Sequence, residues 1–236
     1  MQKILVVPGF WSDGQTVMDV VCRFLAAGFA VEVMTFRKTP ASTMTDFIRQ
    51  TAAVVQSDGI RFLFGHSAGG LICAKVAELL PEVVKCLLLW APAMPRGIMP
   101  IRNQHQLMAL IRTAPALFGD WFRPGFQTAS ATLFNAYSQS DQQFGYSRLT
   151  MEPVRAFKSV FVPGVAIRQV TQPAFLAVGT EDLTTPPEAV IRFSRRFPRC
   201  QQVRYVPNAD HMGILAPRHL GCLDEPIKFI TQAFQL

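Results

Sequence analysis

The chain has 236 residues, of which 50% are hydrophobic and 17% are charged. This length fits one domain that carries an insertion, and the composition excludes an intrinsically disordered chain, which would combine low hydrophobicity with high charge density. No apolar run reaches the roughly 18 residues that a membrane-spanning helix needs, and the N-terminus enters a strand pattern without the layout of a signal peptide. The sequence therefore predicts a soluble protein of the cytoplasm with no membrane span.

The net charge of +7 is concentrated in one part of the chain. Eight basic and three acidic side chains between residues 94 and 170 give this stretch a charge of +5. A nucleic-acid-binding protein would be expected to cluster its basic residues along one element or a recognisable module, whereas these are spread out. We therefore expect no nucleic-acid partner and interpret most of these arginines as part of a solvated face.

The five cysteines, an odd number, lie in apolar segments. They form no C-x-x-C pair, and they have no Cys/His spacing typical of zinc ligands. We expect buried, reduced thiols, which fits the cytoplasm, and no bound metal.

Short apolar runs alternate with helical patterns along most of the chain. Strands are predicted at 3–7, 30–36, 61–64, 85–90, 174–178 and 202–206, and helices at 15–27, 43–57, 68–80, 187–197 and 218–234. Several strand segments are apolar on both faces, as buried parallel strands must be. Because parallel strands need crossover connections, the alternation predicts an α/β fold with a mostly parallel sheet of about six strands and helices on both faces.

The alternation stops after Trp90. From 91 to 171, proline and glycine punctuation is followed by helical patterns near 103–118, 128–139 and 151–161, with no convincing strand. We interpret residues 94–168 as a helical insertion on a core formed by residues 1–93 and 169–236. The insertion is dense in aromatic residues, most of which should pack it onto the sheet while a few line a pocket.

Ser67 stands in the segment Gly65-His66-Ser67-Ala68-Gly69, between the strand predicted at 61–64 and the helix predicted at 68–80. This is G-x-S-x-G in the strand–turn–helix context that the motif requires. A nucleophile in a sharp turn needs small neighbours, because the turn brings backbones together, and a glycine stands two residues away on either side. At a helix start, backbone N–H groups point toward developing negative charge. The pattern predicts a catalytic serine.

A catalytic serine needs a base, and the base needs an acid that orients it. Asp182 follows the strand predicted at 174–178, and His211 follows the strand predicted at 202–206. Catalytic groups of an open α/β sheet lie beyond the carboxyl ends of its strands. We predict His211 as the base and Asp182 as the acid.

Several neighbouring acids and histidines fit these roles less well. Glu181 and Asp210 are the alternative acids, and the Gly-x-x-Asp-x-x-x-Pro spacing that joins a strand to a helix favours Asp182 over Glu181. His66 lies inside the turn and cannot readily face the Ser67 hydroxyl. His105 and His219 lie in helical patterns.

With its order of Ser, Asp and His, the chain resembles the α/β-hydrolase superfamily, specifically members with a helical cap inserted after the strand that follows the nucleophile helix. The resemblance covers nearly the whole chain and implies the α/β-hydrolase fold with residues 94–168 as the cap. It also implies an oxyanion hole formed by the N–H groups of Phe10 and Ala68. Pro8 stands where many members have a histidine, and we expect the N-terminal hairpin of many relatives to be absent.

The resemblance implies acyl transfer without a metal or an organic cofactor, in which Ser67 attacks the carbonyl of an ester or thioester. Trp11 and Arg96 are candidate substrate-binding residues. Two substrate classes remain open: a carboxylic ester, or an acyl thioester on coenzyme A or on an acidic carrier protein, whose phosphate or carboxylate groups suit a basic cap. A third hypothesis is different chemistry on the same fold, by a C–C bond hydrolase, lyase or cyclase.

Overall fold

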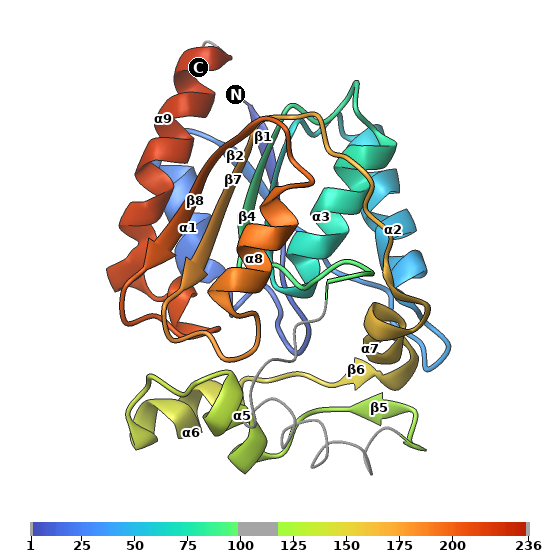
Figure 1. Ribbon diagram of the computed structural model, residues 1–236, viewed down its shortest axis with the longest axis vertical. Helices are drawn as coiled ribbons and strands as arrows, with labels where there is room; N and C mark the ends of the chain where they lie inside the picture. Colours follow the sequence, from blue (N-terminus) through green and yellow to red (C-terminus); the bar gives the residue numbers. More distant parts are fainter. Residues whose placement is uncertain (1, 99–117, 235–236) are drawn as a thin grey trace.

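A six-stranded parallel sheet forms the centre of the molecule (Figure 1). The computed structural model describes residues 2–98 and 118–234. The strands are β1 (Lys3–Val7), β2 (Ala30–Val33), β3 (Phe62–His66), β4 (Cys86–Trp90), β7 (Ala174–Gly179) and β8 (Cys200–Val206). Their order in the sheet is β2-β1-β3-β4-β7-β8, and every neighbouring pair is parallel. The predicted α/β architecture with about six strands is confirmed.

Helices cover both faces of this sheet. The first face carries α2 (Met44–Ser57), α3 (Ala68–Leu79) and α8 (Pro187–Ser194), and the second carries α1 (Met18–Ala26) and α9 (Asp224–Ala233). The chain passes from β1 to β2 at one edge and then crosses to β3 on the other side of β1. The carboxyl ends of β1 and β3 therefore meet at a switch point, which is where open α/β sheets place their sites.

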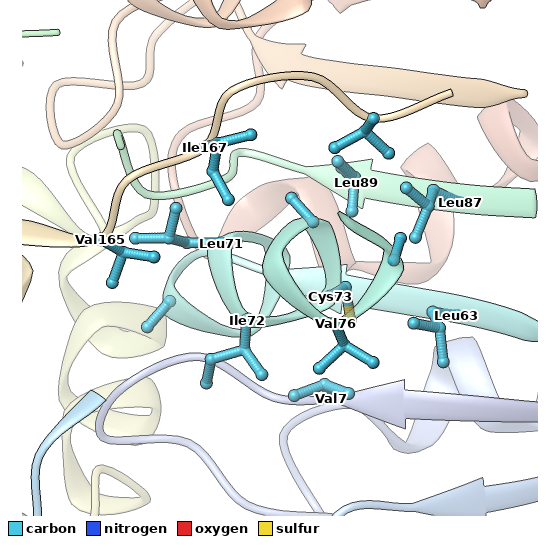
Figure 2. Packing of buried hydrophobic residues seen from close by; sticks show 14 of the residues in the cluster. Val7, Leu63, Leu71, Ile72, Cys73, Val76, Leu87, Leu89, Val165 and Ile167 are labelled. Atoms are coloured by element: carbon cyan, nitrogen blue, oxygen red, sulfur yellow. The ribbon is translucent and has the colours of Figure 1, made fainter. Parts of the chain in front are cut away.

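The core consists of two apolar layers, one on each face, because successive strand residues point to opposite sides. In β1, Leu5 and Val7 belong to the first layer, while Ile4 and Val6 belong to the second. Helix α3 is buried along nearly its whole length against the first layer. Figure 2 shows this packing around α3, with its side chains against three strands and against the segment at 165–167; the labelled residues are Val7, Leu63, Leu71, Ile72, Cys73, Val76, Leu87, Leu89, Val165 and Ile167.

Residues 118–164 lie beyond the carboxyl ends of the strands (Figure 1). They contain α5 (Phe126–Thr132), α6 (Gln139–Ser147), α7 (Val154–Ser159) and a π-helical turn, η2 (Val160–Gly164). The single helix predicted at 128–139 is wrong: the chain turns after Leu133, and α6 starts only after Ser138, whose side chain accepts the Asp141 N–H. The helix predicted at 103–118 falls almost wholly outside the described residues.

Two further expectations for this part of the chain are corrected. We predicted no strand here, but β5 (Trp121–Phe122) and β6 (Glu152–Pro153) pair antiparallel. Strands of two residues are too short to produce a visible alternation in the sequence. The helix predicted at 218–234 is divided, because a 3₁₀ segment (Pro217–Leu223) follows the short 3₁₀ turn Gly213–Leu215 and precedes α9.

The five cysteines are all free, but they are not all buried. Cys22 is exposed on the outer face of α1, which corrects the expectation for that residue, and Cys200 is half-buried. Burial raises the pKa of the thiols of Cys86 and Cys222 to about 12. In the part of the chain described, no helix has both the length and the apolar character needed to cross a membrane.

The contact between α3 and the loop after β1 should tolerate no side chain at Gly69. A Cβ atom there would overlap the Val7 carbonyl oxygen and lie 2.6 Å from the Pro8 carbonyl oxygen. We expect Gly69→Ala to lower the free energy of unfolding by more than about 2 kcal/mol, because backbone atoms must move apart. Gly221→Ala is the control, since nothing lies within 4 Å of a Cβ atom at that position. Urea unfolding of both variants tests this, and equal stabilities would contradict it.

Candidate active site

Ser67 occupies a strained turn between β3 and α3. Its backbone has φ 52° and ψ −123°, a conformation that residues other than glycine rarely adopt. Two hydrogen bonds hold it there: the Ser67 N–H donates to the Trp90 carbonyl (3.0 Å), and the Ser67 carbonyl accepts from the Ala93 N–H (2.8 Å). The turn is thus anchored to the end of β4. It leaves the serine partly exposed, while the residues around it are buried.

The structure brings Ser67, His211 and Asp182 into one hydrogen-bonded chain. The Ser67 Oγ lies 2.9 Å from His211 Nε2, and the His211 Nδ1 lies 2.9 Å from Asp182 Oδ2. His211 and Asp182 are both 2% exposed. With Nδ1–H donating to the carboxylate, the unprotonated Nε2 faces the serine hydroxyl and can accept its proton.

Thr185, which is not among the residues predicted from the sequence, completes the surroundings of the carboxylate. Its N–H donates to Asp182 Oδ1 (2.7 Å) and its hydroxyl to Oδ2 (2.8 Å), while the Thr184 N–H also donates to Oδ1 (2.8 Å). These bonds fix the carboxylate in the plane in which it meets His211. The pattern Asp182-x-Thr184-Thr185 between a strand and a helix is typical of a turn in which the aspartate accepts the N–H groups that follow it, and this pattern could have pointed to Thr185.

His66 supports the histidine loop and does not act on the serine. Its Nε2 donates to the His211 carbonyl oxygen at 2.9 Å, and the side chain is 1% exposed. Burial, together with the charge of His211, lowers the pKa of His66 to about 3. The ring therefore stays neutral at physiological pH and serves as a hydrogen-bond donor to the loop that carries His211.

Among the described residues, neither Glu181 nor Asp210 makes a hydrogen bond to the His211 ring, and His219 makes none to the Ser67 hydroxyl. Glu181 is exposed, and Asp210 accepts the N–H groups of Ala136 (2.7 Å) and Gly213 (2.6 Å). Burial raises the pKa of Asp210. His219 accepts a hydrogen bond from Arg218 Nε at 3.0 Å, and His105 is outside the described residues.

The loop after β1 runs directly beside the turn that carries Ser67. A Cβ atom on Gly9 would lie 2.7 Å from the Ser67 Cβ, so only glycine permits this approach. Phe10 follows at once, and Ala68 is the first residue of α3, where N–H groups have no intrahelical acceptor. The predicted oxyanion donors are therefore on the two segments that meet at Ser67.

The candidate substrate-binding residues have different surroundings. The Trp11 ring contacts the rings of Phe10, Phe122 and Phe157, at centroid separations of 5.6–6.0 Å. Arg96 is exposed; its N–H donates to the Val165 carbonyl. None of the contacts described for the Arg96 side chain involves Ser67, Asp182 or His211.

Residues 132–136 hold the two loops that carry Asp182 and His211. No motif in the sequence connects this segment to the site. The Met212 N–H donates to the Leu133 carbonyl (3.1 Å), and the Ala136 N–H to the Asp210 carboxylate. On the acid loop, the Thr184 hydroxyl donates to the Thr132 carbonyl at 2.9 Å. The loops of Asp182 and His211 are therefore held by a segment some fifty to eighty residues earlier in the chain.

Comparisons with known proteins identify the family of the chain and the folds that resemble it. The model of the alpha/beta hydrolase family matches residues 4–220, so the chain belongs to that family. An extracellular alpha/beta-hydrolase from a Paenibacillus species is similar in structure, with a TM-score of 0.71, 15% identity and 99% of each chain covered. So is the monoacylglycerol lipase of Paleococcus ferrophilus, with a TM-score of 0.69, 18% identity, and 98% of this chain and 93% of that one covered. A search of the curated proteins finds no match.

A third similar structure is a thermophilic esterase from Thermogutta terrifontis. Its TM-score is 0.64 at 18% identity, with 100% of this chain and 88% of that chain covered. At these identities, the likeness to all three structures concerns the fold. The family match over residues 4–220 is what makes this chain a member of a hydrolase family.

The low pKa of His66 predicts part of the acid sensitivity of the protein. Between about pH 3 and 6.5 the unfolded chain binds a proton at His66 that the folded chain does not, so stability falls as the pH decreases through this range. We expect the advantage of the wild type over His66→Gln to shrink by up to about 1.4 kcal/mol per pH unit below pH 6.5. Urea unfolding of both proteins from pH 7.5 to 4.5 measures this difference in the free energy of unfolding. A difference that stays constant with pH would contradict the prediction.

Proposed function

We propose that the protein is a serine hydrolase that cleaves a carboxylic ester through an acyl-enzyme on Ser67. The observation that carries this proposal is the unbroken hydrogen-bonded chain from the Ser67 hydroxyl through His211 to the buried carboxylate of Asp182. A binding protein has no need of these three groups in this order. Membership in the alpha/beta hydrolase family supports the same class of chemistry.

The proposed mechanism follows from the positions of the groups. His211 takes the proton of Ser67 as the hydroxyl attacks the substrate carbonyl, and Asp182 stabilises the resulting imidazolium. The N–H groups of Phe10 and Ala68 bind the oxyanion, and His211 then gives its proton to the leaving alcohol. A water molecule activated by His211 releases the acid and restores Ser67. None of these steps uses a metal or an organic cofactor.

We propose that residues 94–168 form the cap and shape the acyl site. The rings of Phe10, Trp11, Phe122 and Phe157 contact one another next to the loop that carries the Phe10 N–H. Two of these rings come from the loop after β1 and two from the insertion. Such a cluster favours an apolar acyl group over a polar one. Trp11 remains our candidate for contact with it, and Arg96, exposed at the base of the insertion, is the weaker candidate.

A second candidate function is hydrolysis of a thioester carried by an acidic carrier protein or by coenzyme A. A groove lined by Ile98, Arg192, Arg195 and Arg196 favours it, because guanidinium groups suit phosphate and carboxylate. Basic residues of the insertion itself support it less: Arg123 donates to the Leu149 carbonyl, and Arg148 donates to Gln15.

We also propose that the protein acts in the cytoplasm. The five cysteines are free, and two of them are the exposed Cys22 and the half-buried Cys200. Thiols of this kind persist in a reducing compartment. The structurally similar Paenibacillus hydrolase is described as extracellular, so the proposal rests on the cysteines and not on the fold.

The direct test of the enzyme proposal is covalent labelling with an organophosphonate. We expect one mass adduct on Ser67 in the folded wild type and none in Ser67→Ala. On a panel of p-nitrophenyl esters and acyl thioesters, the turnover of Ser67→Ala should be at least about a thousandfold lower than that of the wild type, because no other group replaces the nucleophile. An unlabelled, folded wild type without turnover would contradict the proposal and favour a binding protein.

Salt separates the two substrate classes. If an acidic carrier binds the arginine-lined groove, kcat/KM for a carrier-bound thioester should fall severalfold between low salt and about 0.5 M NaCl, because screening weakens long-range attraction. Turnover of an uncharged p-nitrophenyl ester should not change. The double variant Arg195→Ala/Arg196→Ala should remove the salt dependence and leave ester hydrolysis intact. Equal salt dependence for both substrates would reject the carrier hypothesis.

A further inference from the structure

Glu152 is a buried carboxylate that no step of the proposed mechanism uses. It is the first residue of β6 and is 1% exposed. Its Oε1 accepts two hydrogen bonds, from the Trp11 N–H at 3.1 Å and from the Lys38 ammonium at 2.6 Å. The three residues come from the insertion, from the loop after β1 and from the segment after β2. One carboxylate thus joins three separate parts of the chain.

Burial of this charge is costly, so an apolar side chain would serve better if packing were its only task. Removal of an ion pair from water costs more than the pair regains unless the geometry is favourable, and well-packed apolar residues often replace such pairs without loss of stability. Loss of water raises the pKa of Glu152, whereas Lys38 and the Trp11 N–H act against that rise. Its second oxygen, Oε2, has no partner among the described residues.

The residue that Glu152 holds is itself strained. Trp11 has φ 60°, which is unusual for a large side chain. Both of its backbone polar groups bond to the insertion, since the N–H donates to Glu152 and the carbonyl accepts the Thr150 N–H at 2.9 Å. Without these bonds the strain favours a different backbone conformation at this position.

The position of Trp11 determines the orientation of the preceding residue. The Trp11 N–H belongs to the peptide group that follows Phe10, so the bond to Glu152 limits rotation about the Phe10 Cα–C bond. On the other side of Phe10, Gly9 packs against Ser67. Phe10 is therefore fixed between Ser67 and Glu152, and its N–H is the proposed oxyanion donor.

We propose that Glu152, paired with Lys38, is a positioning residue that holds the loop after β1 so that the Phe10 N–H faces the oxyanion. This role rests on the function proposed above. Glu152 acts through Trp11 and touches no reacting atom. An oxyanion donor is effective only when it is held within hydrogen-bond distance of the oxygen in the tetrahedral intermediate, so this contact should affect the rate of acylation more than the binding of substrate.

Two variants separate the acceptor from the charge. Glu152→Ala removes the acceptor for the Trp11 N–H and leaves Lys38 without its partner; Glu152→Gln keeps a carbonyl acceptor but not the ion pair. Loss of one oxyanion donor lowers kcat about 100- to 1,000-fold in serine hydrolases, so a misplaced donor should cost about 10- to 100-fold. We expect that loss in kcat for Glu152→Ala, with KM within about twofold, and a smaller loss for Glu152→Gln.

Glu78 provides a matched control. Its carboxylate also pairs with a lysine, Lys75, and accepts backbone N–H groups from a distant segment, those of Arg168 and Gln169. It lies in the last turns of α3, away from Ser67 at the start of that helix. Glu78→Gln should lower the melting temperature and leave kcat and KM unchanged.

The experiment measures kcat and KM for a p-nitrophenyl ester, normalised to the active sites titrated with an organophosphonate, and the affinity for a trifluoromethyl ketone, which forms a tetrahedral adduct on serine. For Glu152→Ala and Glu152→Gln, ketone affinity should fall in parallel with kcat/KM. A Glu152 role in stability alone would lower the melting temperature and leave kcat per titrated site at the wild-type value, which overturns the proposal. Lys38→Met, which removes only the partner charge, should reproduce the Glu152→Gln result.

The two proposals fail in different ways. A wild type that neither hydrolyses esters nor binds the phosphonate contradicts the serine-hydrolase function and, with it, the role of Glu152. An active wild type whose Glu152 variants keep full kcat per site contradicts the role of Glu152 alone.

Discussion

The backbone of Ser67 is the constraint on which the rest of the site depends. A strand that turns at once into a helix forces this residue to a positive φ, which costs of the order of 1–3 kcal/mol. Hydrogen bonds to Trp90 and from Ala93 hold the conformation, and the glycines on either side let the neighbouring backbones approach. In return the hydroxyl projects from the sheet, where His211 reaches it, and the first N–H groups of α3 lie beside it.

The central sheet and residues 118–164 contribute differently to this arrangement. Strands β3, β7 and β8 carry Ser67, Asp182 and His211 beyond their carboxyl ends, so the sheet determines where the three residues stand. Residues 118–164 bond to the loops around them: residues 132–136 hold the loops of Asp182 and His211, and residues 150–152 hold Trp11. A small shift of residues 132–136 would therefore move Asp182 and His211, and a small shift of residues 150–152 would move Trp11.

The sequence predicted those features that depend on local patterns. Apolar runs predicted the six strands, and G-x-S-x-G between a strand and a helix marked Ser67. The rule that sites lie at the carboxyl ends of parallel strands then led to Asp182 and His211. Cys22 was misjudged although its position on α1 was informative, because Val20, Val21 and Phe24 turn their helix face inward and leave Cys22 outside.

Contacts made by backbone groups across long separations left no signal. The Trp11 N–H meets Glu152 across 141 residues, and any residue type except proline carries an N–H. In the sequence, Glu152 was only one of three acidic residues in a basic stretch. The division of the chain into a core and a cap at residues 94–168 remains a prediction. So do the catalytic roles of Ser67, Asp182 and His211 and the roles predicted for Phe10, Ala68, Trp11 and Arg96.

In the proposed mechanism, Ser67 attacks a carbonyl whose oxygen is bound by the N–H groups of Phe10 and Ala68. A crystal structure of the protein inhibited by an organophosphonate would show these contacts, because the phosphoryl oxygen takes the place of the oxyanion. The mechanism predicts phosphorus bonded to the Ser67 Oγ and the phosphoryl oxygen about 2.7–3.1 Å from both nitrogens. An adduct on another residue, or a phosphoryl oxygen directed into solvent away from Phe10 and Ala68, would contradict it.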